Sequence, residues 1–145
     1  MGRKMSDIIC VDSDVLIDFQ PGNQLVLREL AYLERVAPLA VSLIMRLELM
    51  IGSPNREFLQ RTEKLLRRFR LLPLTTEIGE LADRWVTEFN LSHGLQLPDA
   101  LIAATALHYQ APPLTKNQRD FRFLPGLKLL PFPPAAPAAA PAPAA

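Results

Sequence analysis

The chain has 145 residues, of which 49% are hydrophobic and 21% charged, a composition that fits a single compact domain with its own core. No apolar run approaches the roughly 20 residues of a membrane span, so we expect a cytoplasmic protein with no membrane partner. One cysteine, Cys10, excludes an intramolecular disulfide and a cysteine-based metal site, whereas a net charge of +1 neither favours nor excludes a polyanionic partner.

The first half of the chain alternates short apolar runs with amphipathic stretches. An apolar run followed by Asp12-Ser13-Asp14 is typical of a buried strand that leads into a helix, because these polar residues can cap a helix. A later helix ends at Gly52-Ser53-Pro54. The predicted elements are a strand over Ile8–Val11, helices over Val15–Phe19 and Gln24–Arg35, a strand over Pro38–Val41 and a helix over Leu43–Ile51.

The second half continues this alternation. The stretch after Pro98-Asp99 is almost free of polar residues, which indicates a helix buried on most sides. The predicted elements are a basic helix over Arg56–Phe69, a strand over Leu71–Leu74, a helix from Thr76 to His93, a helix over Ala100–Tyr109, a strand end at Leu114–Thr115, a polar turn over Lys116–Asp120 and a final strand over Leu127–Leu130.

The alternation of strands and helices predicts the α/β class, with a central, mostly parallel sheet of four to five strands and helices on both faces. We expect one domain over residues 1–130. The remaining residues, 131–145, are proline and alanine only, apart from Phe132, and this composition predicts a disordered or polyproline tail.

Four acidic residues occupy positions that one edge of a sheet could gather. Asp12 follows the first strand, and Glu48 lies inside an otherwise apolar helix. Asp99 stands at the start of the most apolar helix, and Asp120 lies in the late polar turn. Because ligands of doubly wound sheets bind beyond the carboxyl ends of the strands, we predict that these acids share one pocket.

Each acid taken alone also has a purely structural explanation. Asp12 or Asp99 can serve the start of a helix, where an acidic side chain is favoured. Glu48 can be a solvated residue on the outer face of its helix, and Asp120 an ordinary turn acid. The placement of all four together favours the functional interpretation.

A pocket that offers only oxygen ligands suits Mg²⁺ or Mn²⁺ better than zinc. The two histidines, His93 and His108, lie at helix ends, where capping or packing roles explain them. The sequence contains no recognisable Ser-His-Asp or Cys-His arrangement and no glycine-rich phosphate loop.

Four sequence blocks that contain these acids occur in a fixed order before the tail. In this order and at this chain length, they resemble the PIN-domain family, and within it the VapC-type toxins of toxin–antitoxin systems. The blocks are Val11–Asp18, Val41–Leu49, Leu97–Ala106, and Thr115–Phe121 with the later Pro125-Gly126-Leu127.

The resemblance implies a PIN-like three-layer α/β/α fold and a metal-dependent endoribonuclease that uses Mg²⁺ or Mn²⁺. By the same resemblance, Asp12, Glu48 and Asp99 would hold the principal metal ion, Asp120 would assist, and Asn117 would be an auxiliary ligand. The implied partners are RNA as substrate, a VapB-like antitoxin and a second copy of the chain.

Substrate binding is expected from groups close to these acids, namely Ser13, Lys116 and Arg119. Basic side chains attract the RNA backbone without specifying bases. The basic helix supplies further candidates, although its interleaved Glu57 and Glu63 also fit a plain solvated face. These candidates are Arg56, Arg61, Lys64, Arg67 and Arg68.

Two alternatives remain at this stage. Asp12-Ser13-Asp14 is also similar to the opening of a haloacid-dehalogenase-type phosphatase, in which Lys116 would have to be the later catalytic lysine. The second alternative is a binding module with degenerate chemistry, because Met45 and Asn117 stand where the PIN family often has Thr and Asp.

Overall fold

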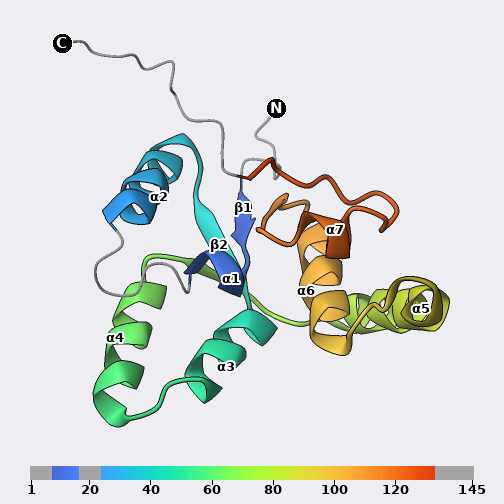
Figure 1. The fold of residues 1–145 in the computed structure, drawn as a ribbon, viewed down its shortest axis with the longest axis horizontal. Helices are drawn as coiled ribbons and strands as arrows, with labels where there is room; N and C mark the ends of the chain where they lie inside the picture. The colour runs from blue at the N-terminus through green and yellow to red at the C-terminus, as the bar shows by residue number, and fades with distance from the viewer. Residues whose placement is uncertain (1–7, 17–23, 133–145) are drawn as a thin grey trace.

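The computed structural model describes residues 8–16 and 24–132. The elements alternate between strands and helices along the chain as predicted (Figure 1). They are β1 (Ile9–Val11), α1 (Ser13–Leu16), α2 (Gln24–Val36), β2 (Leu39–Ser42), α3 (Leu43–Ile51), α4 (Arg56–Leu66), β3 (Arg70–Leu72), α5 (Thr76–His93), α6 (Leu97–His108), β4 (Pro113–Leu114) and α7 (Gln118–Phe121).

The described strands form one four-stranded sheet in the order β3-β2-β1-β4, and all its pairings are parallel. Helices α2 and α4 lie on one side of this sheet, and α5 and α6 lie on the other (Figure 1). The predicted α/β class and its three layers are therefore confirmed. None of the helices in the described ranges is long and apolar enough to cross a membrane.

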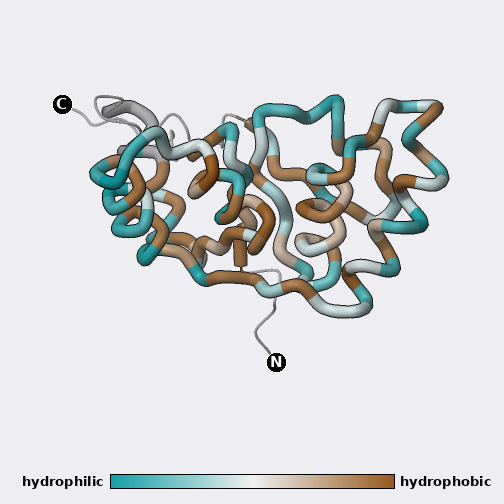
Figure 2. Tube along the Cα trace, turned by 90° about the horizontal axis from the view of Figure 1, so that it is seen from below, coloured by the Kyte–Doolittle hydropathy of each residue, from teal (hydrophilic) through white to brown (hydrophobic). Residues whose placement is uncertain are grey.

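Side chains alternate between the two faces of the central strands. Val11 and Val41 belong to the core cluster that includes buried residues of α2, while Cys10 and Ala40 pack on the opposite face with Ala106 of α6. The small side chains on that face allow α6 to lie close to the sheet. In Figure 2, hydrophilic residues gather on the outward turns of the flanking helices.

The single cysteine is part of this packing. Cys10 is 1% exposed, and burial raises the pKa of its thiol to about 12. A thiol with such a high pKa is not a nucleophile at neutral pH, so Cys10 serves as a small buried hydrophobic residue.

The strand order places a topological switch point at β1. The chain proceeds from β1 to β2 and β3 on one side, and later returns to add β4 on the other side. The Asp12 amide donates to the Leu114 carbonyl oxygen at 2.9 Å and so continues the β1–β4 pairing to the ends of the strands. In open α/β sheets, ligands bind at such a point.

Two predictions for the C-terminal part of the domain are wrong. Leu127–Leu130 is not a strand: Leu130 makes a single backbone bond to the Pro113 carbonyl, and the leucines of this run pack into different core clusters. The polar turn contains the short helix α7, which has too few residues to show helical periodicity.

Several element boundaries also differ. Helix α6 starts at Leu97 instead of Ala100, so Asp99 lies inside its first turn. Helix α1 begins at Ser13, and the rest of the helix predicted over Val15–Phe19 lies outside the described residues, as does the tail from residue 133 onward. The boundary at residue 130 stays a prediction, and Phe132 packs against the core.

Candidate metal centre

Asp12 is held by hydrogen bonds at the end of β1. Its side chain is 6% exposed, and one carboxylate oxygen accepts a hydrogen bond from the Ser13 amide at 2.8 Å. The other oxygen accepts a hydrogen bond from the Thr115 hydroxyl at 2.9 Å. Both oxygens are thus fixed by donors that the chain supplies directly after β1 and β4.

Thr115 connects two acids through one hydroxyl group. Its Oγ1 also lies 3.1 Å from Asp14, so the single hydroxyl proton is shared between the Asp12 and Asp14 carboxylates. The Asn117 amide donates to this same Oγ1 at 3.0 Å and fixes its orientation. The Lys116 amide donates to both oxygens of Asp14 at 3.1 and 3.3 Å.

The electrostatics of Asp12 reflect burial and crowding by like charges. Burial, together with the negative charges of Asp14 and Asp99, raises the pKa of Asp12 to about 6. Hydrogen bonds from Thr115 and the Ser13 amide act in the opposite direction. An ionised Asp12 therefore lacks sufficient compensating positive charge among the described groups.

Asp99 is electrostatically coupled to acids on both sides of the site. Asp12, Asp14, Glu48, Asp99 and Asp120 together form the acidic group. Partial burial raises the pKa of Asp99 to about 6, and the charges of Asp120, Glu48 and Asp14 contribute in that order. Gln96 occupies the N-cap position of α6 without a capping bond from its side chain, so Asp99 is not the cap of this helix. Loss of hydration also raises the pKa of Glu48, although its side chain is exposed.

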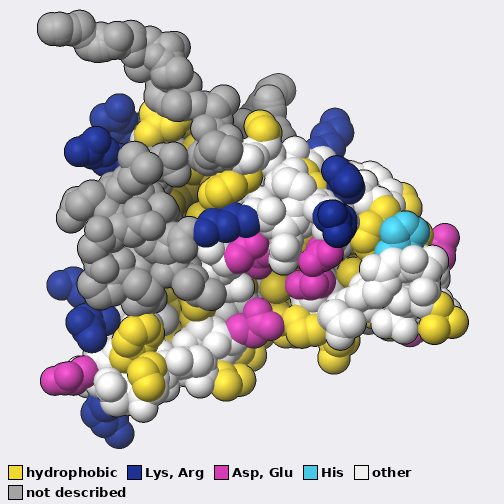
Figure 3. Space-filling model, in the orientation of Figure 1, with side chains coloured by type: hydrophobic (Ala, Val, Ile, Leu, Met, Phe, Trp, Pro, Cys, Tyr) yellow, Lys and Arg dark blue, Asp and Glu magenta, His cyan; other side chains and the backbone are white. Residues whose placement is uncertain are grey.

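The donor set fits a hard divalent cation. It contains only carboxylate oxygens, which Mg²⁺ and Mn²⁺ prefer as ligands. A bound cation would offset the mutual repulsion of these carboxylates. Within the described ranges, no three Asp, Glu, His or Cys side chains already stand in a geometry that could hold an ion. The acids thus interact electrostatically across one site, and metal binding would require their side chains to converge. Acidic side chains gather near the middle of the face shown in Figure 3.

Of the other predicted site residues, some contact the acidic group and others do not. Ser13 and Lys116 contact it through their backbone amides, whereas the Lys116 ammonium lies 6.0 Å from the centre of the Phe132 ring. Asn117 and Arg119 are exposed on α7, the helix that also holds Asp120.

Sequence reasoning missed the roles of Asp14 and Thr115. In the sequence, Asp14 is a possible helix cap and part of the first block, and Thr115 is a strand end and part of the fourth block, but neither is predicted to hold the site together. The contacts between them join residues about one hundred positions apart, so no local pattern could have shown them. The one available signal was the position of Thr115 directly after β4.

Met45, which stands where the PIN family often has Thr, is a core residue. Its side chain is fully buried in the main core cluster, and its amide donates to the N-cap Ser42. The departure at Met45 is therefore a feature of core packing.

The basic helix α4 forms a separate surface. Arg61, Lys64 and Arg67 line an open groove along it, together with Glu57 and Gln60. Arg68, by contrast, is paired with Glu34 of α2. The helix thus has a partly basic, solvated face, and the turn after it carries the ion pair to α2.

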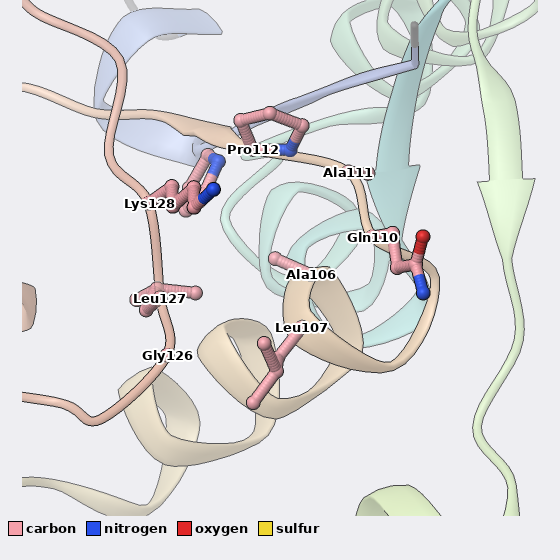
Figure 4. A pocket seen from close by; sticks show the side chains of 9 residues that line it. Ala106, Leu107, Gln110, Ala111, Pro112, Gly126, Leu127 and Lys128 are labelled. Atoms are coloured by element: carbon pink, nitrogen blue, oxygen red, sulfur yellow. The ribbon is translucent and has the colours of Figure 1, made fainter. Parts of the chain in front are cut away.

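An apolar pocket lies away from the acids. It has a volume of about 270 Å³ and is lined by residues of the α6 C-terminus, the start of β4 and the segment from Gly126 to Lys128 (Figure 4). Because the acids follow the carboxyl ends of the strands and this pocket borders the start of β4, the two lie at different ends of that strand.

Comparison with known proteins identifies the class. The PIN-domain profile matches residues 9–127, which is most of the chain. The chain therefore belongs to the PIN-domain family.

Several members of this family, and solved structures with the same fold, are similar to the chain. Ribonuclease VapC10 of Mycobacterium tuberculosis is 36% identical over 100 residues, which cover 68% of this chain and 74% of the relative. A toxin–antitoxin complex from Klebsiella pneumoniae contains a chain that is 32% identical, with a TM-score of 0.66 over 82% of this chain and 94% of that one. VapBC2 of Rickettsia felis, bound to a DNA fragment from its promoter, shares the fold at 20% identity, with a TM-score of 0.71 over 84% of this chain and 96% of that one.

Neutralising Asp12 should stabilise the metal-free protein at alkaline pH. The folded-state pKa of about 6 exceeds the ordinary value of 3.8, so the ionised carboxylate lowers stability as pH rises through that range. In EDTA at about pH 8, Asp12→Asn should raise the free energy of unfolding by up to about 3 kcal/mol, and the gain should vanish below about pH 4. Urea unfolding followed by Trp85 fluorescence measures this.

The matched control is Asp83→Asn, because Asp83 is an exposed acid on α5. This variant should leave the free energy of unfolding nearly unchanged at both pH values. A variant at Asp12 that is no more stable than the wild type in EDTA at alkaline pH would contradict the electrostatic description.

Removing the shared hydroxyl should raise the pKa of Asp12 above about 6, because Thr115 is the side-chain donor that lowers it. Thr115→Val should show this in a carboxyl ¹³C NMR titration and should lower the free energy of unfolding by about 1–2 kcal/mol. Thr115→Ser should behave like the wild type, and Thr87→Val, an exposed threonine on α5, serves as the control. An unchanged Asp12 titration in Thr115→Val would show that the hydroxyl does not stabilise the ionised acid.

Proposed function

We propose that this protein is an endoribonuclease that hydrolyses RNA phosphodiester bonds with the help of a divalent cation, Mg²⁺ or Mn²⁺, and that it acts in the cytoplasm as the toxin of a VapBC-type pair. The observation that carries the proposal is the acidic group at the switch point of a PIN-domain sheet, with Asp12 and Asp99 both raised in pKa by burial and like charges. The identity to a ribonuclease of the same family supports the reaction type.

The acids divide the proposed roles between them. Asp12, Glu48 and Asp99 would hold the principal ion, while Asp120 and Asn117 would assist from α7. A divalent cation bound there activates water and neutralises charge on the scissile phosphate. No nucleophilic side chain is needed for this chemistry.

The remaining groups of the site would orient the Asp12 carboxylate and attract the RNA backbone. The Ser13 amide and the Thr115 hydroxyl fix the two oxygens of Asp12, so this buried carboxylate has little rotational freedom. The exposed Lys116 and Arg119 precede Asp120 in sequence and would attract the RNA backbone without reading bases. Ser13 would lie at the edge of the bound substrate.

We further propose an antitoxin of the VapB type and a second copy of the chain as partners. Solved relatives are toxin–antitoxin complexes, and the most similar of those described above is 32% identical. Large apolar side chains remain exposed on α3, where Ile51 is 83% and Leu47 45% exposed. Exposed apolar residues of this size are common in surfaces that bind other proteins.

The alternatives receive less support. A haloacid-dehalogenase-type phosphatase disagrees with the PIN-family assignment and leaves Glu48 and Asp99 without a role. A binding module without activity is an outcome of the experiment below.

Cleavage of a mixed RNA pool tests the proposal. Purified protein should cut RNA with Mg²⁺ or Mn²⁺ and not in EDTA, and Asp99→Asn should lower the rate by at least about 100-fold because it removes a charged ligand. Asp83→Asn should cut like the wild type.

Equal cutting by Asp99→Asn and the wild type would contradict the assignment of the site. If the folded wild-type protein, freed of any antitoxin, leaves RNA intact with either metal, the protein is instead a binding module.

A further inference from the structure

Three aromatic rings cluster where the C-terminus of α5 meets the end of α7. The His93 ring stacks on Phe123 with centroids 4.1 Å apart and an angle of 20° between the ring planes. Phe89 contacts both rings, at 5.6 Å from His93 and 5.2 Å from Phe123. Phe89 and Phe123 also belong to the partly buried margin of the core that α5 and α6 share, so the cluster has a rigid base.

The same two chain segments hold this cluster and part of the acidic group. His93 ends α5 six residues before Asp99, and Phe123 follows Asp120 by three residues, which is about one helical turn. Asp120 is the charge that most raises the pKa of Asp99, so these two acids are neighbours. The chain segments that carry His93 and Phe123 therefore adjoin those that carry Asp99 and Asp120.

His93 is not required to end its helix. Gly94 ends α5 in the left-handed conformation with φ 71°, and its amide closes the helix on the Asn90 carbonyl. The His93 side chain is exposed, and its ring nitrogen Nδ1 lies 2.8 Å from the hydroxyl of the adjacent Ser92. Capping therefore does not explain His93, and its exposed ring lies on top of the partly buried Phe123.

Two exposed arginines lie close to Phe123 in the sequence. Arg122 directly precedes Phe123, and Arg119 lies one turn earlier on α7. Both are exposed, and neither forms an ion pair with another residue in the described part of the chain. A flat aromatic surface with unpaired guanidinium groups close to it in the sequence matches a nucleotide, whose base stacks and whose phosphate pairs with arginine.

We propose that the ring of His93, supported by Phe123, is a stacking platform for one unpaired base of a single-stranded RNA substrate, and that Arg119 and Arg122 bind the adjacent phosphate. This inference rests on the proposed ribonuclease function and adds a substrate-positioning residue, His93. Sequence-specific recognition of RNA relies widely on bases that are splayed out onto aromatic side chains.

Steady-state cleavage of a short single-stranded RNA oligonucleotide that contains the mapped cleavage site tests this platform. His93→Ala should raise KM about tenfold, which corresponds to ~1.4 kcal/mol and lies within the range of one base–aromatic stack, with a much smaller change in kcat. His93→Tyr should restore KM because it keeps a planar ring. The matched control is His108→Ala, since His108 is the other exposed histidine and ends α6.

A second set of oligonucleotides, each with one abasic nucleotide, identifies the stacked base. At one position, the abasic change should raise KM of the wild type to the level of His93→Ala and should have no further effect on that variant. The proposal is overturned if the abasic change and His93→Ala have additive effects on KM at every position. It is also overturned if His93→Ala leaves KM unchanged. If His93→Ala instead alters self-association in sedimentation and leaves KM unchanged, the cluster is a protein interface and the proposal also fails.

Binding of the same oligonucleotides in EDTA, followed by fluorescence anisotropy, separates this inference from the proposed function. If the wild type binds RNA but does not cut it, the ribonuclease proposal fails, while the platform is still tested by the loss of affinity in His93→Ala. Cleavage by the wild type with equal affinities of all variants would retain the ribonuclease and exclude the platform.

Discussion

Repulsion among carboxylates at the end of β1 and β4 is the interaction on which the described site depends. Asp12 is buried and close to the charges of Asp14 and Asp99, and Asp99 is close to Asp120 and Glu48. Such a group is unfavourable in the absence of a cation because each ionised carboxylate raises the pKa of its neighbours. The fold maintains it because β1, β4 and α6 are fixed by the core on both sides of the sheet.

The sheet order explains why these particular residues meet. Placing β4 beside β1 brings Thr115 to Asp12, although more than one hundred residues separate them in the chain. Small side chains on one face of the sheet let α6 lie close to it, and Asp99 lies in the first turn of that helix. A change in packing between α6 and the sheet would therefore move an acid of the site as well as the core.

Much of this arrangement could be predicted from sequence, because it follows from local patterns. An apolar run before Asp12 and an apolar helix after Pro98 are sufficient to predict a strand end and a helix start, and parallel topology then brings them to one edge. Side-chain contacts over long distances could not be predicted in this way, which is why Asp14 and Thr115 were overlooked. The apolar run at Leu127–Leu130 looked like a strand because local pattern does not distinguish pairing in a sheet from packing of a loop against helices.

A divalent cation shared by the acids at this edge would displace protons when it binds, and this proton release can be measured. Carboxylates with a pKa of about 6 are partly protonated near that pH and must lose their protons to bind a metal ion. Calorimetric titration with Mn²⁺ in buffers of different ionisation enthalpy should therefore show proton release at about pH 6 and almost none at about pH 8. Absence of Mn²⁺ binding, or binding without proton release at the lower pH, would contradict the account.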